Sequence, residues 1–128
     1  MFEKNPRYSE LSKDPQLIGQ ERETNSKSQE EACTILQAED AGLVSVTRRP
    51  DLKLKAGDPN YEYKTDSPTK FSEIKVPRDD SIKDAARLGR NDGDVTIVVN
   101  LMRLRPEMRY AKAFLEAAGV DGVVFINN

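Results

Sequence analysis

Histidine is absent from this 128-residue chain, and cysteine occurs once, as Cys33. Without imidazole the chain has no histidine-activated serine or cysteine nucleophile, no histidine-based ribonuclease chemistry and no zinc site built on histidine. A lone cysteine forms no disulfide within the chain, and the helix-forming residues around Cys33 predict that it packs in an apolar face. Any chemistry must therefore use carboxylates, lysine and hydroxyl groups, with or without a hard metal ion.

Long apolar runs are also missing. No segment approaches the roughly 20 apolar residues that span a bilayer, and Met1 to Glu10 lacks the basic-then-apolar layout of a signal peptide. We therefore expect no membrane-spanning segment, and we expect any export signal to lie outside this chain. A composition of 37% hydrophobic and 33% charged residues is typical of one globular domain with its own core.

The net charge of −2 gives no overall signal for nucleic acid, but the charge is unevenly distributed. From Arg48 to Arg90 there are eleven Lys and Arg against eight Asp and Glu, whereas the rest of the chain has nine against fourteen. The middle of the chain is therefore where a polyanion, if one binds, is expected to bind. Each basic side chain alone is more often solvated than bound to RNA. The candidate phosphate contacts are Arg48, Arg49, Arg78, Lys83 and Arg87.

Apolar spacing and turn residues divide the chain into a polar lead-in, residues 1–27, and a single domain, residues 28–128. One short turn is expected near Tyr8 to Leu11. The order α-β-β-β-α-β-α-β predicts an α/β fold, a mixed sheet flanked by helices. Helices are expected at 28–40, 80–88 and 106–118, and strands at 43–47, 61–65, 69–76, 95–101 and 120–126.

Acidic residues and one lysine form a candidate catalytic group. Alternation along 69–76 places Glu73 and Lys75 on one face of a strand, with Asp58 ahead of the hairpin and Glu31 on the first helix. Carboxylates that hold Mg²⁺ can activate water and neutralise the charge that develops on a phosphodiester, and two or three of them suffice. Lysine beside them can orient the water or hold the phosphate.

This pattern resembles the PD-(D/E)xK nuclease superfamily, in which an acid near one hairpin strand precedes Glu or Asp, any residue and Lys on the next. The resemblance implies a restriction-endonuclease-like core and a divalent metal, Mg²⁺, held by Asp58, Glu73 and Glu31. It gives Lys75 the water-orienting role. The resemblance covers roughly Ser28 to Val76 in motif terms and extends loosely to the C-terminus through the order of elements.

Together with the opening Asn5 to Ser9, the helix-then-hairpin arrangement is similar to the C-terminal toxin domains of bacterial contact-dependent growth inhibition proteins. This similarity implies a tRNA-cleaving endoribonuclease that is exported as part of a larger protein and acts in the target-cell cytoplasm. It further implies RNA, specifically tRNA, and a cognate immunity protein as partners. A DNA endonuclease of the same fold, or a non-enzymatic immunity or interaction domain, remains an alternative.

Several structural roles compete with these assignments. Ser28 and Glu31 match a capping box, in which Glu31 bonds back to the Ser28 amide, and Glu30 is then its natural substitute in the site. Asp58 can simply initiate a turn before Pro59. Many relatives carry an acid directly before an aromatic residue, whereas Asn60 precedes Tyr61 here. Either Asp58 replaces that acid, or Asn60 weakens or inactivates the site. Asp51 ranks below Asp58, and hairpin tyrosines more often enter a core than stack on bases.

Overall fold

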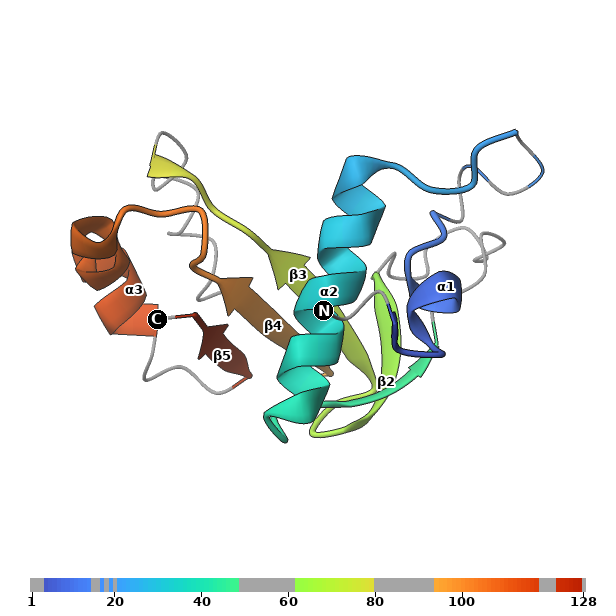
Figure 1. Ribbon diagram of the computed structural model, residues 1–128. Coiled ribbons are helices and arrows are strands. Elements are labelled where there is room, and N and C mark those ends of the chain that lie inside the picture. The colour runs from blue at the N-terminus through green and yellow to red at the C-terminus, as the bar shows by residue number, and fades with distance from the viewer. Residues whose placement is uncertain are drawn as a thin grey trace, which may run out of the picture.

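The computed structural model describes residues 4–14, 17, 19, 21–48, 62–79, 94–117 and 122–127, and Figure 1 shows a mixed α+β fold built on one curled sheet. No helix in these ranges is long and apolar enough to cross a membrane. The elements in chain order are α1 (Tyr8–Leu11), α2 (Ser26–Asp40), β1 (Ser45–Arg48), β2 (Tyr63–Ser67), β3 (Phe71–Lys75), β4 (Val95–Asn100), the 3₁₀ helix η4 (Pro106–Tyr110), α3 (Lys112–Ala117) and β5 (Val123–Ile126).

The five described strands form one sheet in sequence order, β1-β2-β3-β4-β5. β1, β2 and β3 pair antiparallel, whereas β3 pairs with β4 and β4 with β5 in parallel. The predicted mixed sheet and the antiparallel hairpin are confirmed. The carboxyl ends of β3, β4 and β5 therefore lie at the same edge of the sheet, where polar side chains from several strands can gather.

The cap of helix α2 lies three residues before its predicted position. The Asn25 side chain accepts a hydrogen bond from the Ser28 amide (2.7 Å), and the Ser28 hydroxyl accepts one from the Asn25 amide (2.9 Å). The predicted capping box of Ser28 with Glu31 is therefore wrong, because Asn25 supplies the cap and Ser28 occupies the third helical position. Gly42 has φ +76°, which agrees with the predicted left-handed end after the helix.

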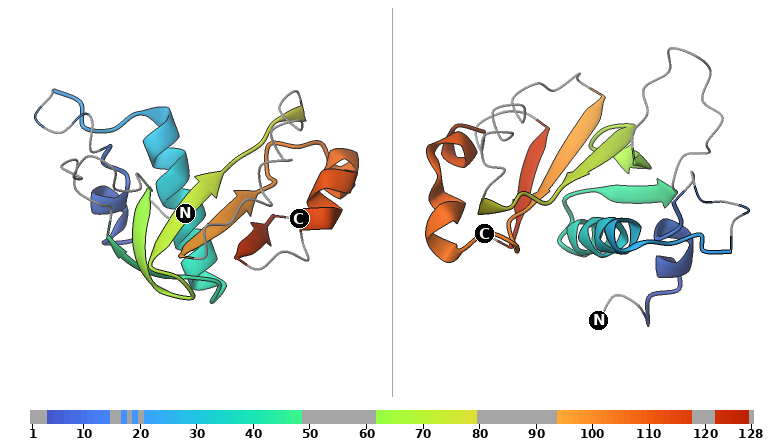
Figure 2. Two further views of the ribbon diagram at one scale, coloured as in Figure 1. Left: turned by 180° about the vertical axis from the view of Figure 1, so that it is seen from behind. Right: turned by 90° about the horizontal axis from the view of Figure 1, so that it is seen from above.

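Two apolar clusters cover the two faces of the sheet, and β4 contributes to both. One cluster joins α1 and α2 to the sheet, with Leu11, Ile35 and Tyr63 each at most 1% exposed. The other joins Val99 of β4 to Phe114 of α3. In Figures 1 and 2, α2 crosses the sheet, and α3 lies at the β4–β5 end away from α1. All six residues of β4 are buried, as a strand covered on both faces requires.

The N-terminal part of the chain contributes to this core. The short turn expected at Tyr8 to Leu11 is the helix α1, and the Tyr63 hydroxyl donates a hydrogen bond to the Leu11 carbonyl oxygen (3.1 Å). Arg7 contacts both Glu39 of α2 and the carbonyl oxygen of Val46 of β1. Residues of the expected polar lead-in thus pack on the domain.

The predicted helix 106–118 is wrong as one continuous element. Ala111 is extended (φ −57°, ψ 143°) and separates η4 from α3. This break lets Phe114 pack edge-on against Phe125 of β5, with ring centroids 6.3 Å apart. Packing of a buried aromatic side chain outweighs the continuity of a short helix. The predicted helix 80–88 lies outside the described residues.

A buried polar network ties α2 to the carboxyl ends of β4 and β5. The Asn100 side chain, 2% exposed, donates to the Thr34 hydroxyl (3.0 Å) and accepts from the Asn127 amide group (2.8 Å). Asn127 in turn exchanges hydrogen bonds with Gln37 of α2 (2.7 and 3.2 Å). Because each amide has a fixed set of partners, the network fixes the position of α2 along the sheet.

Replacing Asn100 by Ala should destabilise the protein by about 2–3 kcal/mol, because Thr34 and Asn127 lose a buried partner. The free energy of unfolding from urea titration measures this loss. Asn5→Ala is the control, since Asn5 is exposed and makes a local bond to the Arg7 amide. A loss for Asn100→Ala no larger than that of the control would show that the network does not stabilise the fold.

Candidate active site

Glu73 and Lys75 form an ion pair on one face of β3. Lys75 Nζ lies 3.2 Å from Glu73 Oε1, and the two side chains are 47% and 30% exposed. The residues between and before them, Ile74 and Ser72, are buried on the other face. The prediction that Glu73 and Lys75 share a face is therefore confirmed. A pair this accessible contributes little to stability.

A third charged residue, Glu62, directly precedes β2, the strand that pairs with β3. The antiparallel register pairs Tyr63 with Ser72, so one further step brings Glu62 opposite Glu73. Opposite residues of an antiparallel pair have side chains on the same face and about 5 Å apart at Cβ. Tyr63 points the other way and is fully buried under α2. The prediction that hairpin tyrosines enter the core is confirmed for this residue.

The Glu62 carboxyl group is held in an unfavourable environment. Its Oε2 atom is enclosed and accepts no hydrogen bond from any residue that the structure describes. The pKa of Glu62 is raised from 4.5 to about 7, mainly by burial and then by the negative charges of Glu73 and Glu31. A backbone hydrogen bond and the Lys75 ammonium act in the opposite direction but do not offset burial. Carboxyl groups with such shifts concentrate at functional sites.

Glu31 reaches this group from α2. It is 8% exposed and is close enough to Glu62 for its charge to raise the pKa of Glu62. It lies in the second turn of the helix rather than in the cap, so its capping role is excluded. Glu30, the natural substitute, instead binds the Arg103 guanidinium, with Arg103 Nε 2.6 Å from Glu30 Oε2. Glu62, Glu73 and Lys75 thus lie together on two neighbouring strands, and the charge of Glu31 acts on Glu62 from α2.

Of the other predicted site residues, Arg78 and Arg48 belong to the described part of the chain. Arg78 is exposed after β3, three residues beyond Lys75. Arg48 ends β1, and its side chain lies outside what the structure describes. Outside the described residues altogether are Asp58, Asn60, Arg49, Lys83 and Arg87.

The donor set has the chemistry of a hard-cation site. Magnesium prefers carboxylate oxygens and keeps several of its waters, so two acids can hold it. Glu62 offers an enclosed oxygen with no hydrogen-bond donor, and Glu73 is its cross-strand neighbour. In the described part of the chain, no three Asp, Glu, Cys or His side chains are positioned as a group that could hold a metal ion. Among the described acids, the cross-strand neighbours Glu62 and Glu73 are therefore the two candidates for holding a cation.

Glu62 was missed by the sequence reasoning, although the hairpin contains a signal for it. The Thr65 amide donates to the Lys70 carbonyl oxygen (2.9 Å) across the turn. Counting outward from that pair matches Glu62 with Glu73. An acid opposite the Glu of a Glu-x-Lys strand is thus visible once the turn is placed, whereas the search for an acid directly before Tyr61 led to Asp58.

Replacing Glu62 by Gln should stabilise the protein at pH 8 and have little effect at pH 4. Because folding raises the pKa of Glu62 from 4.5 to about 7, the wild-type free energy of unfolding falls as pH rises between these values and is flat above them. The gain at pH 8 is at most on the order of 3 kcal/mol. Urea titrations across this range measure it, with the exposed Glu10→Gln as control. If the free energies of unfolding of the wild type and Glu62→Gln changed in parallel with pH, the raised pKa of Glu62 would be contradicted.

Comparisons of the chain with models of known protein families, with curated proteins and with solved structures find no match. The site must therefore be interpreted from its own residues.

Proposed function

We propose that this chain is a metal-dependent endoribonuclease of the PD-(D/E)xK type, and specifically a tRNA-cleaving toxin domain of bacterial competition systems. The observation that carries the proposal is the largely buried Glu62 carboxyl, which lies opposite the Glu73–Lys75 ion pair and whose Oε2 atom accepts no hydrogen bond from any described residue. Two acids and an amine on adjacent strands are the minimum that this chemistry requires. A structural ion pair alone does not account for a second, buried acid beside it.

The order of the elements supports the same proposal. A helix that carries Glu31 precedes an antiparallel β1-β2-β3 meander, and β4 returns parallel to β3. The resemblance described above expects an acid near the first hairpin strand and Glu-x-Lys on the second. Glu62 meets the first expectation by position, and we assign it the role given earlier to Asp58. Residues 80–93, where the crossover helix is predicted, lie outside the described residues.

Each residue has a defined role in this proposal. Glu62 and Glu73 would hold Mg²⁺, with Glu31 as the nearby third acid, and the ion would supply the positive charge that stabilises a phosphodiester under attack. Lys75, held beside Glu73 and 47% exposed, donates a hydrogen bond to the attacking water or to a phosphate oxygen. The Lys75 ammonium also compensates part of the negative charge of the acids when no phosphate is bound.

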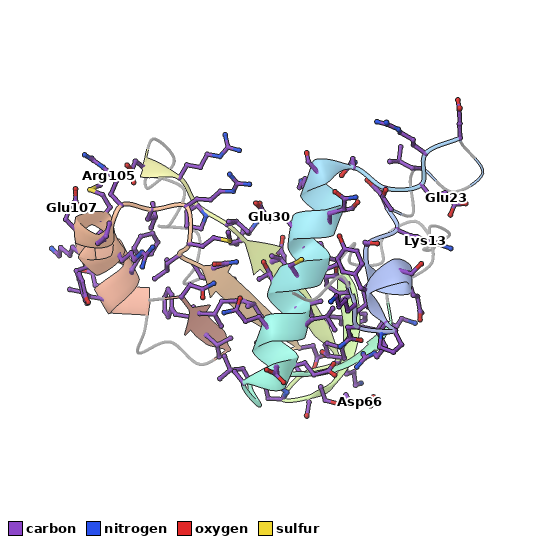
Figure 3. The ribbon with its side chains drawn as sticks, viewed as in Figure 1. Lys13, Glu23, Glu30, Asp66, Arg105 and Glu107 are labelled. Atoms are coloured by element: carbon purple, nitrogen blue, oxygen red, sulfur yellow. The ribbon has the colours of Figure 1, made fainter. Side chains whose placement is uncertain are left out.

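Cleavage assays on purified tRNA and total RNA test this proposal, with plasmid DNA as a second substrate. We expect RNA to be cut in Mg²⁺ and not in EDTA. Glu73→Gln and Lys75→Met should each lower the cleavage rate by about 10² or more, because each removes a group that acts on the reacting phosphate. Asp66→Asn is the matched control, since Asp66 is an exposed acid at the β2–β3 turn (Figure 3).

The outcomes of this assay separate the alternatives. Cutting of plasmid but not RNA would identify a DNA endonuclease with the same site. Cutting of neither substrate in Mg²⁺ or Mn²⁺ by the folded wild-type protein would overturn the enzyme proposal. Adding Asp58→Asn to the series compares the two candidate upstream acids, and we expect Glu62→Gln to abolish more activity than Asp58→Asn. Circular dichroism of each variant controls for loss of the fold.

A further inference from the structure

A segment rich in charged residues follows β4 and is separate from the acids Glu31, Glu62 and Glu73. Residues 102–112 contain four basic residues and one acidic residue, a net charge of +3 in a chain whose net charge is −2. Two large side chains in this segment, Met102 and Tyr110, are 53% and 69% exposed. Leu104, by contrast, is buried and anchors the segment to the core. The segment thus presents an exposed aromatic ring and four basic side chains, which we call the basic surface. Three of these side chains are paired with acids: Arg103 with Glu30, Arg105 with Asp79 and Glu107, and Lys112 with Glu116.

The arginines of this surface are held in defined positions by acids from other elements. Arg103 donates through both Nε and Nη2 to Glu30 of α2. Arg105 donates through Nε to Asp79 Oδ2 (2.7 Å), and its backbone amide donates to Asp79 Oδ1 (3.2 Å). Both guanidinium groups remain accessible, with side chains 41% and 65% exposed. A guanidinium has five N–H donors, so each arginine keeps donors for a phosphate oxygen.

This surface begins beside the proposed active site. β3 and β4 are parallel, and Lys75 pairs in register with Val99 near the end of β4. Each acid that holds an arginine is also close in sequence to a residue of the proposed active site. Glu30 adjoins Glu31 on α2, and Asp79 follows Lys75 by four residues. Figure 3 shows Glu30 on the side of α2 that faces this segment, and Arg105 and Glu107 at the η4 end of the molecule.

Tyr110 gives the surface a second type of contact. It ends η4 next to Arg109, whose Nε donates to the Leu104 carbonyl oxygen (3.3 Å). An aromatic ring that is 69% exposed leaves most of its area in water. Unpaired nucleic-acid bases stack on such rings, and the phosphates on either side bind to arginine. Fixed arginines together with an exposed ring favour a single-stranded nucleic acid over a protein partner, which would require a larger apolar area.

We propose that residues 102–112 bind a single-stranded stretch of RNA, with Arg103 and Arg105 on its phosphates and Tyr110 stacked on a base. The strand would continue from this surface to Lys75. This inference rests on the proposed function for the identity of the nucleic acid. The binding itself requires no cleavage, and it can be measured separately.

Fluorescence anisotropy with a labelled RNA strand of mixed sequence tests the proposal in EDTA, where no metal supports cleavage. Tyr110→Ala should weaken binding about tenfold, because stacking on one base is lost. The double variant Arg103→Gln, Arg105→Gln should lower the slope of log affinity against log salt by about 1.4, since two phosphate contacts disappear. Lys13→Gln is the control, because Lys13 is also half exposed and paired with an acid, Glu23, but lies at the opposite end of the molecule (Figure 3).

The outcomes distinguish this proposal from the proposed function. Binding that depends on Tyr110 and the arginines, with no cleavage in any divalent metal, supports the surface and overturns the nuclease. Cleavage of RNA with unchanged affinity in both surface variants supports the nuclease and overturns the surface. Absence of RNA binding by the wild-type protein also overturns the surface. Equal affinity for a fully paired duplex would overturn the stacking contact, because the base faces of a duplex are covered. A DNA strand of the same sequence shows whether the 2′-hydroxyl contributes.

Discussion

Antiparallel pairing of β2 with β3 brings Glu62 opposite Glu73, and the rest of the site depends on this pairing. A carboxyl group placed there loses water and gains two acidic neighbours, Glu73 and Glu31, which raises its pKa to about 7. Folding tolerates this cost although a polar uncharged residue would avoid it. Such a cost is characteristic of a site that is completed by a cation or a proton. Lys75 lowers the cost only in part.

Placement of the third acid depends on polar contacts far from the site. Asn100 and Asn127 at the carboxyl ends of β4 and β5 bind Thr34 and Gln37, and so fix α2 along the sheet. Thr34 also donates to the Glu30 carbonyl oxygen (2.9 Å), one helical turn before it. The same helix carries Glu30 and Glu31. The charge of Glu31 raises the pKa of Glu62 and Glu30 holds Arg103, so the proposed active site and the basic surface both depend on α2.

Much of the fold could be predicted from the sequence, because hydrophobic period and turn residues are local signals. The strands at 63–67, 71–75 and 95–100, the helix α2 and the mixed sheet follow from them. The cap at Asn25 and the break at Ala111 could not, since a cap competes with its neighbours and the break serves the contact of Phe114 with Phe125. Glu73 and Lys75 share a strand, so their pairing was predictable. Glu62 depends on strand register, and its burial depends on tertiary packing that no local pattern encodes.

The central claim is that Glu62, Glu73 and Lys75 form one electrostatic unit. Its most direct test is a ¹³C NMR titration of the Glu62 side-chain carboxyl in the wild-type protein and in Glu73→Gln, without metal. The account predicts a midpoint near pH 7 in the wild type and a lower midpoint in the variant, because one negative neighbour is removed. A midpoint near 4.5 that does not change between the two proteins would contradict it.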